Sequence, residues 1–131
     1  MLMGLFIRHF RVDMSDAVHS EPGNYPDFNS FFTRALRDGV RPQPAEPTAI
    51  ACPVDGTISE LGRIHGDRLL QAKGRYYSLV DLLGGNRERA DAFRDGLFCT
   101  LYLSPGDYHR IHMPVEGDLN ETSYIPGRLF S

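Results

Sequence analysis

Apolar residues near the N-terminus recur at the spacing of a helix. Within residues 1–14 they fall at i, i+3, i+4 and i+7, and would therefore share one helical face. Arg8 and Arg11 are the only formal charges before Asp13. A short basic amphipathic helix of this kind can lie in a lipid interface, but its apolar face can equally pack on the rest of the protein. That face consists of Met3, Phe6, Ile7 and Phe10.

A second helical pattern follows a polar loop over residues 15–26. Asp27 is a suitable N-cap, and Gly39 suits the position just after a helix, so the pattern predicts one helix from Asp27 to Gly39. We expect its apolar side chains to lie in the core rather than to bind a ligand. They are Phe28, Phe31, Phe32, Ala35 and Leu36.

Beyond a proline-rich connector over 41–47, the pattern changes to short strands and turns. The nearly continuous apolar run over 97–103 is typical of a buried strand. The fold class that this order predicts is α+β: N-terminal helices followed by a mainly antiparallel β domain with short helices. The other expected strands or extended segments are 48–52, 57–64, 68–72, 108–113 and 118–125, and the short helices are 78–83 and 87–94.

Composition and charge exclude several classes of function. The net charge is −3 and no block of Lys and Arg occurs, so nothing indicates a nucleic-acid partner. Cys52 and Cys99 match no zinc or CxxC spacing and are expected to be buried free thiols of a reducing compartment. No window reaches the roughly 18 to 20 apolar residues of a membrane span. The start lacks the features of a signal peptide. Together these features favour a cytosolic protein, with a membrane surface as a possible location.

Titratable side chains are concentrated between two prolines, at residues 103–114. His109 and His112 are three positions apart, which on an extended segment sends them to opposite sides and argues against a shared metal. Either imidazole could serve as a general base, or both could be structural. The titratable residues of the segment are Asp107, Tyr108, His109, Arg110 and His112.

Two further residues have both an ordinary and a chemical interpretation. Asp55 stands in a Pro-Val-Asp-Gly turn, and a carboxylate can also orient a histidine in a Ser/His/Asp arrangement. Lys73 is either a solvated lysine at a strand end or a point charge for a phosphate or carboxylate. The candidate nucleophiles lie in no nucleophile-elbow pattern; they are Ser59, Ser78, Ser104 and Ser123.

Several motifs, taken in order, resemble the front half of a bacterial phosphatidylserine decarboxylase proenzyme. The most specific is Asp-Tyr-His-Arg-Ile-His-Met-Pro at residues 107–114. The resemblance covers nearly the whole chain. The other segments that carry it are 28–34, 41–42, 53–56, 71–74, 77–79, 82–85, 103–105, 125–127 and 129–131.

This resemblance implies an enzyme that converts phosphatidylserine to phosphatidylethanolamine and CO2. In the family, the proenzyme cleaves itself at a Gly-Ser-Thr motif, and the serine becomes a pyruvoyl group that forms a Schiff base with the substrate. By motif position, Asp55 and His112 match the aspartate and histidine of self-cleavage. His109 matches a histidine that assists decarboxylation, and Lys73 and Tyr108 are candidates for substrate contact.

The resemblance also implies partners and a location. These are phosphatidylserine, an anionic membrane surface at the cytoplasmic face of the cell membrane, and the α chain that carries the pyruvoyl group. The expected organisation is a membrane-facing amphipathic helix over 1–14, a helix and connector over 15–47, and part of the catalytic β-chain domain over 48–131.

No Gly-Ser-Thr motif occurs in the 131 residues. We therefore expect an incomplete fold, and no decarboxylation by this chain alone, because without a carbonyl electron sink the carbanion is not stabilised. Strands left without neighbours would expose apolar surface. The alternative is a non-catalytic remnant that binds lipid or a partner.

Overall fold

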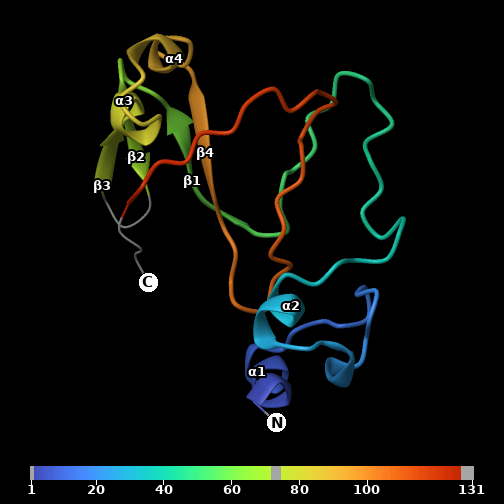
Figure 1. The fold of residues 1–131 in the computed structure, drawn as a ribbon. Coiled ribbons are helices and arrows are strands. Elements are labelled where there is room, and N and C mark those ends of the chain that lie inside the picture. The colour runs from blue at the N-terminus through green and yellow to red at the C-terminus, as the bar shows by residue number, and fades with distance from the viewer. Residues whose placement is uncertain (1, 72–74, 128–131) are drawn as a thin grey trace. The chain divides into compact units, whose positions relative to one another are not determined.

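The computed structural model describes residues 2–71 and 75–127. It confirms the α+β class and divides into two compact units. Unit 1 holds the described residues up to Thr57 together with Tyr102–Gly117, and unit 2 holds those from Ile58 to Leu101 and from Asp118 onward. In chain order the elements are α1 (Leu2–Phe10), a 3-10 turn (Pro22–Asn24), α2 (Phe28–Phe32), β1 (Thr57–Arg63), β2 (Arg68–Gln71), β3 (Arg75–Ser78), α3 (Leu79–Leu82), α4 (Arg87–Asp91) and β4 (Leu97–Tyr102) (Figure 1).

The core of unit 1 is aromatic and lies between α1 and α2. The ring of Phe6 packs edge-on against Phe28, Phe31 and Phe32, with centroid distances of 4.9, 6.0 and 6.3 Å. Phe31 is fully buried. The predicted N-terminal helix is therefore present, and Phe6, on its apolar stripe, packs within the protein.

Helix α2 begins where the sequence predicts but ends much earlier. The Asp27 carboxylate accepts a hydrogen bond of 2.7 Å from the Ser30 N–H, which caps the helix and holds the pKa of Asp27 below its usual value. The predicted continuation to Gly39 is wrong. Residues 35–37 instead pair with the loop before the helix: Val18 N–H donates to the Ala35 carbonyl, and Arg37 N–H to the Asp16 carbonyl.

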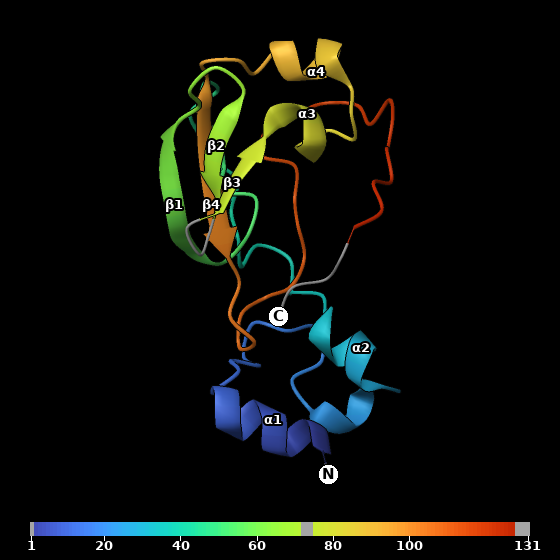
Figure 2. The ribbon, with the colours of Figure 1, turned by 90° about the vertical axis from the view of Figure 1, so that its left-hand side faces the viewer.

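Unit 2 contains two small sheets with two short helices. β1 pairs with β4, and β2 pairs with β3 in antiparallel register, from Arg68 opposite Ser78 to Gln71 opposite Arg75 (Figure 2). The side chains of Ser78 and Asn86 accept hydrogen bonds from the N–H groups of Asp81 and Arg89, and so cap α3 and α4. The core of the unit consists of Ile64, Leu79 and Ala90, with Tyr77, Val80, Leu83 and Phe98 packed around it.

The structure confirms some predicted strands and corrects others. β1, β2 and β4 match the predicted segments within two residues, whereas β3 was not predicted. Within the described residues, 48–52, 108–113 and 118–125 form no strand ladder. Residues 48–52 and 108–113 lie beside prolines, which remove donors from a ladder.

The apolar run at 97–103 is not buried as predicted. Leu97 is 71% exposed and Tyr102 is 58% exposed, because β4 has a single neighbouring strand among the described residues. Cys52 and Cys99 are free, as expected, but both are exposed rather than buried.

The compact units do not follow the segments 1–14, 15–47 and 48–131. Residues 102–117, which carry the histidine motif, belong with the N-terminal helices in unit 1. The Arg110 side chain illustrates the reason: its Nε donates a hydrogen bond of 2.8 Å to the carbonyl of Thr33, at the end of α2.

Replacing Phe31 by Ala should lower the free energy of unfolding by about 3–5 kcal/mol, because a fully buried ring is removed from between two helices. Urea denaturation of the 131-residue chain measures this. Phe93, which is 54% exposed, is the control, and its change to Ala should alter stability by less than about 0.5 kcal/mol. Equal effects of the two changes would contradict the assigned core.

Candidate functional site

The histidine motif begins with a tight turn against the end of α1. Asp107 N–H donates to the Ser104 carbonyl at 2.9 Å, and Ser104 N–H donates to the Asp107 carboxylate at 2.6 Å. Gly106 lies in this turn, and a Cβ atom on it would be 2.7 Å from the backbone oxygen of Phe10, the last residue of α1. Glycine is therefore needed there, because it lets the two backbones approach.

A buried arginine just beyond the end of α2 supports the same turn. Arg34 is 4% exposed, and its Nη2 donates to the carbonyls of Gly106 and Asp107 at 3.4 and 3.5 Å. Its guanidinium also lies 5.6 Å from the ring of Phe31. Burial lowers the pKa of Arg34 from its ordinary value. The end of α2 thus fixes the position of the motif.

The two histidines of the motif have different partners. The Nδ1 atom of His109 lies 2.9 Å from the carbonyl oxygen of Asp107, and its ring lies 3.9 Å from the ring of Phe32. The Nε2 atom of His112 lies 2.8 Å from the hydroxyl of Tyr108, which is 7% exposed. His109 is therefore oriented by Asp107 and Phe32, and His112 by Tyr108.

Asp55 and His112 both line a cavity of about 530 Å³. The backbone N–H of His112 donates to the Pro53 carbonyl at 2.8 Å, which ties the motif to the Pro-Val-Asp-Gly turn. The whole cavity lies within unit 1. It is lined by Leu36, Arg37, Asp38, Gly39, Val40, Arg41, Pro42, Gln43, Pro44, Ile50, Ala51, Cys52, Pro53, Val54, Asp55, Tyr108, His112 and Met113.

The Asp55 carboxylate is held by an arginine. Within the described residues, its hydrogen bonds come from Arg41 Nε, at 3.1 and 2.9 Å to its two oxygens, and from Arg41 Nη2 at 2.6 Å; none comes from His112. Arg41 Nη1 donates to Asp16 at 2.9 Å. The Asp55 carboxylate, and to a smaller extent that of Asp16, raises the pKa of Arg41.

The sequence alone indicates part of this arrangement. Of the candidate residues, Asp55, Tyr108 and His112 line one cavity, His109 lies beside Phe32, and Lys73 falls outside the described residues. The two arginines and Asp16 were given no role. Arg34 lies among the apolar positions of the predicted helix, and this placement was the signal that could have indicated a buried arginine.

Residues 2–71 and 75–127 contain no group of three His, Cys, Asp or Glu side chains arranged to hold a metal ion. No helix in those ranges is both long enough and apolar enough to cross a bilayer.

Known proteins match the chain over nearly its full length. Residues 28–131 match the phosphatidylserine decarboxylase family. A phosphatidylserine decarboxylase proenzyme of Methylococcus capsulatus is 56% identical over 130 residues, covering 99% of this chain and 45% of that protein. Proenzymes of Stutzerimonas stutzeri and Alkalilimnicola ehrlichii are 57% and 54% identical, covering 96% and 100% of this chain and 42% and 46% of their own lengths.

The chain therefore spans less than half the length of these relatives. The family match nevertheless includes Asp55, Tyr108 and His112, which line the cavity, and His109 beside it in the motif. On this evidence, the chain belongs to the phosphatidylserine decarboxylase family.

Proposed function

We propose that the cavity of unit 1 is part of the site at which a phosphatidylserine decarboxylase cleaves itself and then decarboxylates phosphatidylserine. The observation that carries this proposal is that Asp55 and His112 line the same cavity, where the backbone N–H of His112 donates a hydrogen bond to the Pro53 carbonyl in the turn that holds Asp55. The relatives' description as proenzymes of this decarboxylase supports it.

We assign His112 as the base in self-cleavage. Tyr108 holds one ring nitrogen, and within the described residues the other, Nδ1, makes no hydrogen bond. A carboxylate that accepts a hydrogen bond from an imidazole fixes its tautomer and stabilises the imidazolium that forms when the ring takes a proton. Asp55, which lines the same cavity, is the residue that we assign to this role.

His109 is suited to a different proton transfer. A carbonyl oxygen only accepts hydrogen bonds, so the contact to Asp107 requires a proton on His109 Nδ1. The neutral ring then carries its lone pair on Nε2, which can take up a proton and return it. We assign the proton exchanged at Nε2 to the decarboxylation step.

The residues present fit the pyruvoyl group that the family implies. The phenol of Tyr108 and the imidazole of His112 line the cavity, and either can donate a hydrogen bond to a carbonyl or carboxylate oxygen once their mutual contact is released, the imidazole in its protonated form. When bound, such a group supplies an electron sink for decarboxylation. Tyr108 and His112 are the residues that would lie against it, and Lys73 remains a candidate for substrate contact from the sequence alone.

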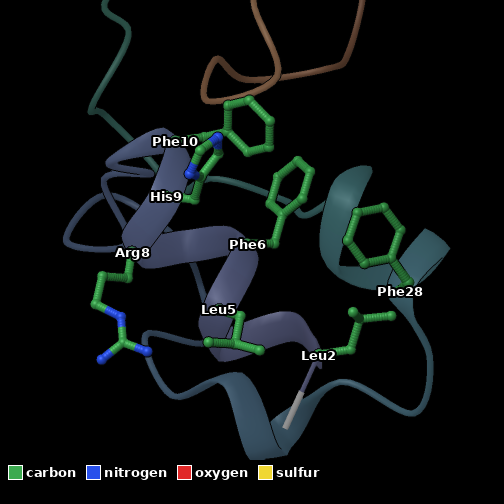
Figure 3. Close-up of a pocket in the computed structure, with 7 residues that line it drawn as sticks. All are labelled: Leu2, Leu5, Phe6, Arg8, His9, Phe10 and Phe28. Carbon is green, nitrogen blue, oxygen red and sulfur yellow. The ribbon is translucent and has the colours of Figure 1, made fainter.

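The N-terminal helix suggests how the protein meets its lipid substrate. α1 and Phe28 line an apolar groove of about 660 Å³, in which Leu2 is 75% and Leu5 is 48% exposed. Figure 3 shows Arg8 extending from α1 away from Phe28. Apolar side chains beside a cation suit an anionic lipid interface. We propose that this groove, rather than Phe6, contacts the membrane, and that it does so at the cytoplasmic face.

The groove also favours a second candidate, a protein that binds lipid or a partner without catalysis. The two candidates differ in one measurable respect. In a chimaera where residues 1–131 replace the matching 45% of the Methylococcus capsulatus proenzyme, the catalytic candidate predicts self-cleavage and CO2 release. The binding candidate predicts neither.

In that chimaera, His112→Ala should leave a single uncleaved band on a denaturing gel, because the base of self-cleavage is lost. His109→Ala should still be cleaved but should release CO2 at least about a hundredfold more slowly, as expected for a lost general acid. His65→Ala, which changes an exposed histidine of unit 2, is the control and should match the unchanged chimaera. Parental CO2 release by cleaved His109→Ala protein would remove His109 from the mechanism.

The neutral ring of His109 should carry its proton on Nδ1, because its partner there is a carbonyl oxygen. The 15N spectrum of histidine-labelled protein, recorded with the ring in its neutral form, reports which nitrogen is protonated. A His109→Gln variant assigns the signal. A spectrum with the proton on Nε2 would contradict the assigned proton path.

Leu2→Glu together with Leu5→Glu should reduce flotation of the chimaera with anionic vesicles by about tenfold or more, because two exposed leucines leave the lipid interface. Leu61→Glu, at a residue of unit 2 that is 66% exposed, is the matched control. Equal flotation of both variants would exclude α1 as the membrane contact.

A further inference from the structure

Arg41 connects three segments of unit 1 through one guanidinium. Its Nε and Nη2 bind the Asp55 carboxylate in the turn at 53–56, and its Nη1 binds both Asp16 and the carbonyl of Val40 at 2.9 Å. Each nitrogen of the side chain is therefore engaged. The catalytic assignment above gives no role to either Arg41 or Asp16.

We propose that Arg41, held by Asp16, is a positioning residue that fixes the Asp55 carboxylate on the cavity wall so that it can accept a hydrogen bond from His112. This inference rests on the proposed function and extends it to two residues that do not touch the histidine. In this role Arg41 sets the plane and direction of the Asp55 carboxylate and does not itself contact the reacting groups.

The pattern of distances leaves one carboxylate oxygen available. Oδ2 of Asp55 receives two short contacts, of 2.9 and 2.6 Å, whereas Oδ1 receives a single longer one of 3.1 Å. An ionised carboxylate has about four lone-pair sites on its two oxygens. Oδ1 therefore keeps capacity for an imidazole N–H while Arg41 remains bound.

Stability alone does not account for this arrangement. The side chains of Arg41 and Asp55 are 50% and 35% exposed, and exposed ion pairs contribute little to folding free energy. A two-nitrogen contact does, however, impose a fixed geometry that a point charge cannot impose. Asp16 adds to this because its own backbone is fixed, through the hydrogen bond from Arg37 N–H to its carbonyl.

Unit 2 offers a matched control pair. Arg94 binds Asp91 through its Nε and Nη2 at 3.2 and 2.6 Å, with side-chain exposures of 53% and 61%. This pair resembles the contact between Arg41 and Asp55 in type but lies outside the cavity. Its removal tests for any general effect of deleting an exposed arginine.

The test measures self-cleavage of the chimaera. Arg41→Ala should slow cleavage by about ten- to a hundredfold, because the carboxylate loses its orientation. Low millimolar guanidinium chloride should restore a large part of the rate, since the site of the half-exposed side chain is open to solvent. Arg94→Ala should cleave at the parental rate with or without guanidinium, and sodium chloride should not replace guanidinium.

Two further variants separate positioning from folding. Asp16→Asn keeps Arg41 and Asp55 but weakens the support, and should slow cleavage several-fold with an unchanged melting temperature. Arg41→Lys keeps the charge without the two-nitrogen contact, and should recover only part of the rate. If Arg41→Ala does not fold, Asp16→Asn decides: an unchanged cleavage rate in this variant would overturn the proposal.

The two proposals fail in different ways. An unchanged chimaera that folds but does not cleave itself would overturn the proposed function and this inference with it. A chimaera that cleaves, and that does so equally fast with Arg41→Ala, would overturn the positioning role alone. Slower cleavage that guanidinium does not restore would assign Arg41 a purely structural role, and would likewise overturn the proposal.

Discussion

The arrangement of unit 1 depends on the contact of the buried Arg34 guanidinium with the turn that precedes the histidines. Removing a charged group from water is costly, and the lowered pKa of Arg34 reflects that cost. The ring of Phe31 and the carbonyls of Gly106 and Asp107 offset part of it. Because those carbonyls lie in the turn just before the histidines, the arginine fixes the place from which both imidazoles project.

The second arginine of the site works in the opposite environment. Arg41 is half exposed, so its guanidinium keeps much of its hydration in the folded chain. Its two carboxylate partners raise its pKa. Arg34 therefore determines where the histidine motif lies, whereas Arg41 determines how the Asp55 carboxylate is presented. Neither residue contacts an imidazole through a hydrogen bond among those found in the described residues, yet each constrains a group that we assign to catalysis.

Local sequence predicted the beginnings of elements better than their ends. The caps at Asp27, Ser78 and Asn86 are side-chain oxygens that accept a nearby N–H, which is a contact within three residues. The end of α2 depends on hydrogen bonds from residues 35–37 to the loop at 16–18, which no helical periodicity reveals. β4 was similarly misjudged, because its apolar composition predicted burial while its exposure depends on which strands lie beside it.

The sequence by itself determined the α+β class, the family, and the residue types available for chemistry, because these depend on local pattern and on the order of motifs. It placed Asp55, His109 and His112 among the candidates but could not show which groups meet. Tertiary structure decided that His112 is bound to Tyr108, that Asp55 is bound to Arg41, and that the motif packs on α2. The contacts of Asp55 with Arg41 and of the motif with α2 join residues 14 and 77 positions apart, and the contact between Tyr108 and His112 depends on how the motif is bent. Their energies depend on distance and burial, which only the folded chain sets.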